Sequence, residues 1–479
     1  MKKNRIICLL LCSLLLIQSL FSGAGAVDGT AGDASVISGC RSIDAAKPLD
    51  KSEKLLDTSK AVLVYEMNSG TLLYTWNADQ TIYPASMVKL MTALVALEYG
   101  DLSSVATVTR KTLDTVDIGS VSANLKVGEE ISLKDLLYCL MVSSANDAAA
   151  VIAAQVAGSQ EAFIDLMNQK AAELGCTGTH FSNAHGLHHA ETYTTARDIC
   201  RILQAGLEIS EFRAMFEAKT YLVPATNKSE ERILNTTNYM MRKVDISQYY
   251  SKYYDERVTG GKTGSTDQAG RCLAVTAEQD DMRLLAIVMG AEPTYEEEGL
   301  SLKTFGSFEE MAQLLDYCFQ NYECRQILCE GQALLQMNVS DGANDVVATP
   351  VENISTVLPK EMDESGLTWT YSDTPGSLIA PVAQGQKLAT VAVWYDGLCV
   401  AQSDLVAMNA AAASVEPTEP PQEQKTVEDN DGTLIATILG IILGMVVLAA
   451  VILLVVRAAH MAAYRARQRR RRRNRRRNH

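Results

Sequence analysis

The chain of 479 residues lacks the short motifs that mark two common classes of hydrolase. It contains no H-E-x-x-H, the pair of helical histidines that holds zinc in many metallopeptidases. It also contains no G-x-S-x-G, the turn that presents a nucleophilic serine in many histidine-dependent hydrolases. We expect the histidines in the middle of the chain to be loop or core residues rather than zinc ligands: His180, His185, His188 and His189.

Acidic residues are absent from both ends of the chain. All 57 lie between residues 27 and 432, whereas three basic residues precede this stretch and 11 arginines follow it. Of the 43 basic residues, 29 therefore remain in the middle part, whose formal net charge is −28. Such an excess favours solubility and argues against docking to nucleic acid or anionic lipid by charge.

A compact cysteine framework is also absent. Two of the 11 cysteines, Cys8 and Cys12, lie in an N-terminal segment that we expect to be removed, which leaves nine. An odd and scattered set does not predict a disulfide scaffold, even in an exported protein. We expect Cys318, Cys324 and Cys329 to be buried thiols.

The N-terminus has the pattern of a secretory signal. Lys2, Lys3 and Arg5 precede an apolar run, and Ala24-Gly25-Ala26 is a small-residue cleavage site. Residues 1–26 are therefore a predicted signal peptide. Residues 27–57, which are small, polar and unpatterned, are a predicted spacer.

A long uncharged run stands near the C-terminus. Residues 433–456 would extend about 36 Å as a helix, enough to cross a bilayer with some tilt. The arginines of residues 457–479 would form either a nucleic-acid patch or, as is more usual directly after a span, a cytoplasmic tail that fixes the topology. We expect a single-pass protein of the cell membrane whose folded part lies outside the cytoplasm, and no nucleic-acid partner.

A serine and a lysine open an unusually apolar helix. Pro84 suits a first helical turn, the residues up to Leu97 leave almost no polar face, and Gly100 is a natural stop. Ser86 and Lys89 are three residues apart, so their side chains project from the same face of this helix. Burial and the positive end of the helix dipole favour a neutral Lys89 amine, which can take a proton from the serine.

Two further fragments carry matching chemistry. Ser144 and Asn146 follow an apolar run and lie on a predicted loop between helices. The K-T-G-S-T segment at 262–266 follows a strand-like stretch at 257–259, and its glycines let a substrate backbone come close. Each fragment is weak alone, but S-x-x-K, S-x-N and K-T-G in this order are the signature of penicillin-binding proteins and serine β-lactamases.

The first folded part has predicted strands at both ends and predicted helices in its middle. This order predicts a mainly antiparallel sheet whose first and last strands pair, with a largely helical insert packed on it and the Ser86 helix between the two. The strands are expected at 61–66, 71–76, 271–276 and 283–289, and the helices at 131–142, 147–156 and 159–174.

A smaller β-rich unit follows. Residues 321–408 contain short alternating runs of Val and Thr, with turns at Asp341-Gly342 and Asp396-Gly397. Residues 409–432 are rich in Pro and Glu and read as a stiff linker to the predicted span.

Over about two-thirds of its length the chain resembles the low-molecular-mass penicillin-binding proteins that are D-alanyl-D-alanine carboxypeptidases. Beyond the three motifs, residues 183–187 are similar to the family's N-P-H-G-L, with Ala184 replacing the proline, and residues 378–386 resemble its C-terminal β domain. The resemblance implies an α+β DD-peptidase fold, similar to that of β-lactamases, over residues 58–320. It also implies a small all-β C-terminal domain.

The activity that the resemblance implies is removal of the terminal D-alanine from peptidoglycan stem pentapeptides, through an acyl-enzyme on Ser86. Lys89 would be the base and Ser144 would relay a proton to the leaving D-alanine. β-Lactams would bind covalently, and no metal or organic cofactor is implied. The backbone N–H groups of Ser86 and Ser265 would form the oxyanion hole, and the substrate would be held by Asn146, Lys262, Thr263, Gly264, Ser265 and Thr266.

Two departures from the family pattern stand out. Ser307 occupies a position where members often carry an arginine, so an ion pair anchored there is not expected. Members commonly end in an amphipathic surface helix, whereas this chain ends in a predicted full span.

Three alternatives use the same motifs. A DD-endopeptidase would cut cross-links instead of terminal residues. A serine β-lactamase would usually show S-D-N and a loop with a deacylating glutamate, but Ala145 replaces that aspartate. A non-enzymatic sensor would bind muropeptide or β-lactam through an inactive site, although every catalytic residue is present.

Overall fold

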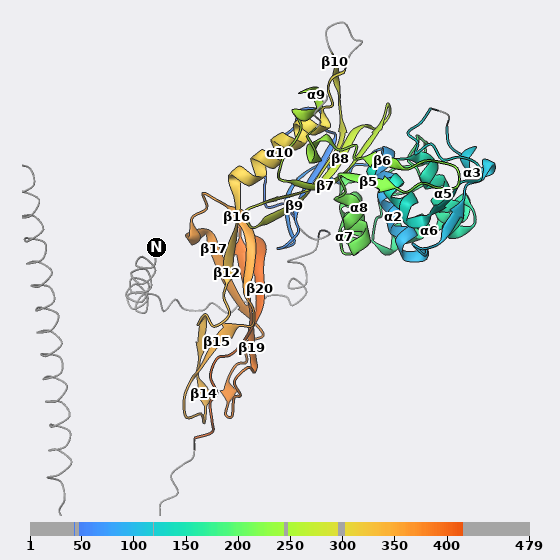
Figure 1. Ribbon diagram of the computed structural model, residues 1–479. Coiled ribbons are helices and arrows are strands. Elements are labelled where there is room, and N and C mark those ends of the chain that lie inside the picture. Colours follow the sequence, from blue (N-terminus) through green and yellow to red (C-terminus); the bar gives the residue numbers. More distant parts are fainter. Residues whose placement is uncertain (1–42, 44–46, 118, 244–247, 296–301, 415–479) are drawn as a thin grey trace, which may run out of the picture. The chain divides into compact units, whose positions relative to one another are not determined.

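The computed structural model describes residues 43, 47–117, 119–243, 248–295 and 302–414 (Figure 1). The expected signal peptide, transmembrane span and arginine tail lie outside these residues, as does the expected linker from residue 415 onward. The first residues of that predicted linker, 409–414, are described, and Ala411 is buried in the core of the second domain, so the domain extends beyond its predicted end at 408. Within the described part of the chain, no helix combines the length and the apolar character needed to cross a membrane.

The first domain is built on a five-stranded antiparallel sheet with the order β2-β1-β9-β8-β7. Strand β1 pairs with β9 along its whole length, so the first and last parts of the domain meet as the sequence predicts. The strands are β1 (Ala61–Glu66), β2 (Thr71–Trp76), β7 (Val258–Thr266), β8 (Gly270–Gln279) and β9 (Met282–Ala291).

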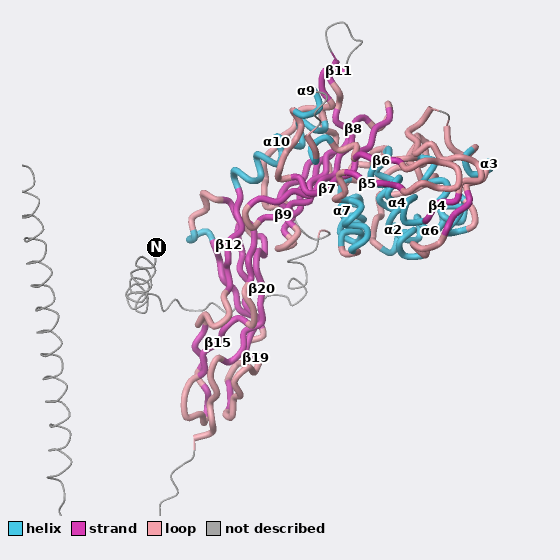
Figure 2. Tube along the Cα trace, in the orientation of Figure 1, coloured by secondary structure: helices cyan, strands magenta, loops and turns pink. Residues whose placement is uncertain are grey.

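The two faces of the sheet bury different partners, because successive residues of a strand point to opposite faces. Leu63 and Ile287 belong to a core shared with the helical insert, whereas Val64 and Leu284 belong to a core shared with α10 (Ser307–Asn321). Figure 2 shows the insert helices gathered on one side of the strands and α10 on the other. The predicted α+β layering is confirmed.

Helix α2 (Val88–Tyr99) lies within the helical insert and is buried from Val88 to Ala96. It is hydrophobic on almost every side because α4, α5, α6, α7 and α8 surround it. The other helices of the domain are α3 (Arg110–Leu113), α4 (Leu133–Val142), α5 (Asn146–Ala157), α6 (Gln160–Glu173), α7 (Ala196–Leu207), α8 (Ser210–Phe216) and α9 (Gln248–Ser251). Short strands complete the domain: β3 (Val105–Thr107), β4 (Glu130–Ser132), β5 (Thr220–Val223), β6 (Arg232–Asn235), β10 (Thr294–Tyr295) and β11 (Leu302–Thr304).

One strand differs from its prediction. The strand expected at 257–259 continues to Thr266, so K-T-G lies inside the edge strand β7 rather than after it. Glycines usually weaken a strand, but here they are needed for close approach. A Cβ on Gly261 would lie only 2.3 Å from Nδ2 of Asn238.

The second domain is all-β apart from a single 3-10 turn, as expected. Its main sheet has the order β13-β15-β20-β19-β17, beside the pairs β12-β16 and β14-β18. The predicted Asp396-Gly397 turn joins β19 to β20, and both residues have positive φ, as tight hairpin turns require. The strands are β12 (Tyr322–Leu328), β13 (Leu335–Met337), β14 (Val339–Ser340), β15 (Val346–Pro350), β16 (Ile354–Pro359), β17 (Leu367–Ser372), β18 (Leu378–Ile379), β19 (Lys387–Tyr395) and β20 (Leu398–Ala407).

Most of the described cysteines are thiols rather than members of a disulfide. Cys318 is buried as predicted, whereas Cys324 and Cys329 are only partly buried free thiols. Cys399 takes part in a disulfide, which the sequence did not predict.

Candidate active site

Ser86 stands at the start of the central helix, in a tight turn. A 3-10 turn (Ala85–Met87) precedes α2, and Ala85 adopts a positive φ of 48° that only special contacts can hold in a residue other than glycine. Lys89 lies one turn further on with no exposed surface, and its Nζ is 2.9 Å from the Oγ of Ser86. The predicted serine–lysine pair is therefore formed.

Lys89 has two further partners, both of them acceptors. Its Nζ donates to Oδ1 of Asn146 at 2.6 Å and to the backbone carbonyl of His185. A neutral amine has two N–H groups and one lone pair. In the neutral form the two acceptors can take both N–H groups, which would leave the lone pair for the hydroxyl of Ser86, as a base requires.

The electrostatics favour this neutral form. Burial is the main cause that lowers the pKa of Lys89 well below its usual value, and the charge of Lys262 lowers it further. The carboxylate of Asp147 acts in the opposite direction, but it does not outweigh burial.

A second hydroxyl–amine pair lies opposite the first. Ser144 joins α4 to α5 with a positive φ of 62°, and Lys262 of β7 donates to its Oγ at 2.8 Å. Nζ of Lys262 also donates to the carbonyl of Thr263 at 2.9 Å. Burial lowers the pKa of Lys262 to about 7, so this amine exchanges its proton near neutral pH.

These groups surround a cleft of about 220 Å³ between β7, the Ser86 turn and the loop before α5. Lys89, Asn146 and Lys262 lie beneath it, whereas Thr266 does not line it and instead accepts from the N–H of Ala269 in the following turn. Thr263 also bonds the hydroxyl of Thr237 at 2.5 Å. The cleft is lined by Ser86, Val121, Ser144, Thr237, Tyr239, Thr263, Gly264, Ser265, Arg271, Cys272, Phe305, Ser307 and Phe308.

Asp147 is a site residue that the sequence motifs do not include. Its buried carboxylate accepts from the N–H groups of Ala123 and Leu125 at 2.9 and 3.0 Å and from the hydroxyl of Ser122 at 2.6 Å. These bonds hold the loop whose Val121 lines the cleft. The signal was its position, directly after the Asn146 of the second motif.

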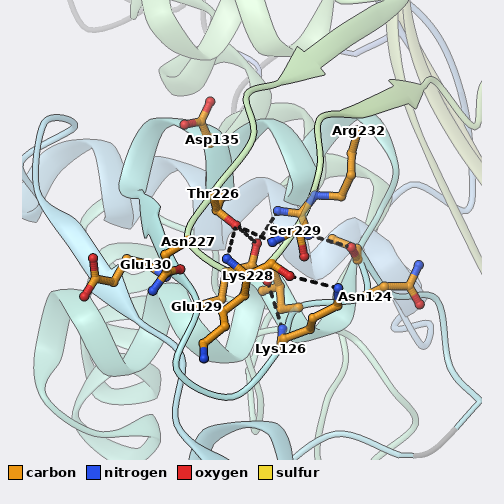
Figure 3. A network of polar contacts seen from close by, with 12 residues as sticks. Asn124, Lys126, Glu129, Glu130, Asp135, Thr226, Asn227, Lys228, Ser229 and Arg232 are labelled. Carbon is orange, nitrogen blue, oxygen red and sulfur yellow. Dashed lines mark hydrogen bonds and ion pairs between the residues drawn. The ribbon is translucent and has the colours of Figure 1, made fainter.

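A second network fixes the same loop from the other side (Figure 3). Glu129 is fully buried and pairs with Arg232 at 2.5 Å, and the other end of the guanidinium donates to the carbonyl of Ala123 at 3.1 Å. Thr226 donates to Glu129, and Lys126 donates to the carbonyl of Lys228. The turn between β5 and β6 therefore holds the cleft loop in place, and the carboxylate of Glu129 is bound within this network.

The clustered histidines make separate local contacts. Nδ1 of His185 accepts from the N–H of Leu187, and the backbone carbonyl of His185 accepts from Lys89. Burial and the charge of Lys89 lower the pKa of the His185 ring to about 4. His188 packs edge-on against Tyr83, and His180 bonds the carbonyl of Glu191.

Comparison with known proteins identifies both domains. Residues 50–293, slightly more than half of the chain, match the D-alanyl-D-alanine carboxypeptidase family, peptidase family S11. Residues 322–413 match the C-terminal domain of penicillin-binding protein 5.

Individual relatives agree over most of the chain. D-alanyl-D-alanine carboxypeptidase DacF of Bacillus subtilis (strain 168) is 27% identical over 362 residues, which cover 74% of this chain and 87% of that protein. DacA of Escherichia coli (strain K12) is 29% identical over 364 residues, which cover 74% of this chain and 83% of that protein. The crystal structure of penicillin-binding protein 5 from Haemophilus influenzae superposes with a TM-score of 0.57 at 27% identity, covering 75% of this chain and 99% of that one. With these matches and the serine–lysine site together, the chain belongs to the D-alanyl-D-alanine carboxypeptidases of the low-molecular-mass penicillin-binding protein family, serine peptidases of the bacterial cell wall.

Proposed function

We propose that this carboxypeptidase releases the terminal D-alanine of peptidoglycan stem pentapeptides through an acyl-enzyme on Ser86. Lys89 takes the proton of the Ser86 hydroxyl as the oxygen attacks the carbonyl of the penultimate D-alanine. Ser144 passes a proton to the departing D-alanine nitrogen, and water then cleaves the ester. The observation that carries this proposal is the buried Lys89 amine, 2.9 Å from Ser86, with its two other partners both acceptors.

The remaining motif residues have binding roles in this proposal. Asn146 orients the substrate amide, while Lys262 and Thr263 form the end of the site that receives the terminal carboxylate. Thr266, which does not line the cleft, keeps only a supporting role through its bond to the turn after β7. The backbone N–H groups of Ser86 and Ser265 stabilise the oxyanion, and each such donor typically contributes about 3 kcal/mol. Gly264 leaves room for the substrate, since a Cβ there would lie 3.0 Å from the carbonyl oxygen of Pro84 in the Ser86 turn.

The lining of the cleft favours a carboxypeptidase over a β-lactamase. Among the described residues that line it there is no Asp or Glu. The nearby Glu129 is bound to Arg232 and is therefore not free to activate a deacylating water. Hydrolysis of a penicilloyl ester is expected to be slow as a result.

Penicillin is therefore expected to label the protein once, on Ser86, with a long-lived adduct. Intact-mass and peptide mass spectrometry would measure the stoichiometry and the position. Ser86→Ala should abolish labelling, whereas Ser143→Ala should leave it unchanged, because that hydroxyl only donates to the carbonyl of Cys139. Rapid turnover of penicillin, or an adduct on another residue, would contradict the proposal.

We also propose that residues 433–456 anchor the enzyme with its domains on the outer side of the membrane and the arginine tail inside. The family's cell-wall substrate and the charge pattern of the tail support this topology. Deleting residues from 430 onward is expected to release a soluble enzyme that penicillin still labels. Protease added to wall-less cells should digest the catalytic domain and spare the tail; a protected catalytic domain would refute the topology.

A further inference from the structure

Arg271 is a cleft residue to which neither the motifs nor the mechanism above gives a role. It lies in β8, directly opposite Ser265 of β7, and its side chain lines the cleft together with Thr263 and Ser307. It is only partly buried, so its charged end remains accessible to a ligand.

Among the residues that the structure describes, Arg271 has no acidic partner. It forms no ion pair with any residue that the structure describes, and its guanidinium carbon is 5.6 Å from the ring centroid of Phe305. Other arginines of this domain, such as Arg232 and Arg257, are each held by carboxylates. A guanidinium that packs near an aromatic ring and has no carboxylate partner can bind the carboxylate of a ligand.

The other cations at the cleft are already engaged. Lys89 serves Ser86 in its neutral form, and the ring of His185 is buried and neutral near pH 7. Lys262 uses two of its three N–H groups on Ser144 and the carbonyl of Thr263, and its pKa of about 7 leaves it only partly charged at neutral pH, so its contribution to carboxylate binding is smaller than that of a permanent cation. A guanidinium, by contrast, keeps its charge throughout the physiological range.

We propose that Arg271 binds the free carboxylate at the C-terminus of the stem peptide and so makes a terminal D-alanine, rather than an internal one, the preferred leaving group. This inference rests on the proposed function and names the specificity-determining residue of the same site. The carboxylate lies over Ser265 and Thr263, whose hydroxyls add hydrogen bonds, and the planar guanidinium matches its two oxygens. The scissile bond then lies one residue away from Arg271, toward Ser86.

The test compares two peptides that differ only in the group that Arg271 recognises. One is an N-acylated tripeptide ending in D-Ala-D-Ala with a free carboxylate, and the other is its C-terminal carboxamide. Release of D-alanine or D-alaninamide by the full-length protein gives kcat/KM for each. The variants are Arg271→Gln, Arg271→Lys and, as a matched loss of one positive charge outside the cleft, Arg325→Gln, whose native partner is Glu323 of β12.

Arg271→Gln is expected to lower kcat/KM for the acid roughly 10- to 100-fold, mostly through KM, and to change kcat/KM for the carboxamide less than about 2-fold. Arg271→Lys should recover part of the loss, and Arg325→Gln should behave as wild type. Equal losses on both peptides would show a structural role for Arg271, and no loss on the acid would show no role; either result overturns the inference. If the wild type releases nothing from either peptide, the proposed function fails, and the inference fails with it.

Discussion

Lys89→Arg is expected to lower the rate of Ser86 acylation at least about 100-fold, the usual scale for a lost general base. Arginine keeps a positive charge but has no accessible neutral form, so it cannot take the proton of Ser86. Its larger head group must also enter a site with no exposed surface, in which the native amine already has three partners. The rate of penicillin labelling under single-turnover conditions measures this step directly.

Lys262→Arg is the matched control, because it makes the same replacement in the second buried amine of the cleft. Lys262 is proposed to act mainly as a cation, so this variant should keep part of its activity and raise KM more than it slows acylation. In the wild type, acylation should increase as pH rises through the pKa of Lys89, which burial and Lys262 hold well below its usual value. If Lys89→Arg is acylated at nearly the wild-type rate, Lys89 is not the base, and Ser144 activated by Lys262 becomes the better candidate.

Gly186→Ala is expected to damage both the stability of the fold and the site, because Gly186 packs against the turn that carries Ser86. A Cβ there would lie 2.1 Å from the carbonyl oxygen of Ala85 and 3.1 Å from the Cα of Ser86, and the residue has a φ of +83°. Overpacking and left-handed strain together should cost roughly 3 kcal/mol of unfolding free energy. Displacing the Ser86 turn by about 1 Å should slow acylation about 100-fold.

Gly175→Ala separates the effect of backbone strain at a positive φ from the effect of the steric clash. Gly175 also has a positive φ, of +70°, but a Cβ there would meet nothing within 4 Å. Gly175→Ala should lower the unfolding free energy only through backbone strain, by about 1 kcal/mol, and the variant should be acylated at the wild-type rate. Chemical denaturation and penicillin-labelling kinetics would be measured on both variants. Acylation of Gly186→Ala at the wild-type rate would show that the turn does not depend on this close contact.

Local patterns in the sequence predict most of the fold. The hairpin of β1 and β2 has the predicted bounds, since alternating apolar residues around Asn68-Ser69-Gly70 specify both strands and their turn. The helices α4, α5 and α6 also lie where the apolar periodicity predicts them, to within two residues at each end. The predicted strand stopped at residue 259, whereas β7 continues to Thr266, because the glycines that usually weaken a strand are required here for close packing against it.

The sequence by itself determined the Ser86–Lys89 pair and the family, because both are local: the two residues share a face through their spacing, and the order of the three motifs is the family signature. Only the tertiary structure decided what surrounds those groups. The two acceptors that bind the Lys89 amine, Asn146 and His185, are 57 and 96 positions away in the sequence. The Glu129–Arg232 clamp joins residues 103 positions apart. No periodicity or propensity encodes such pairings, since they arise when separately specified elements pack against one another. Arg271 illustrates the same limit: its sequence context marks a strand residue after a turn, and only the folded sheet places its charge in the cleft.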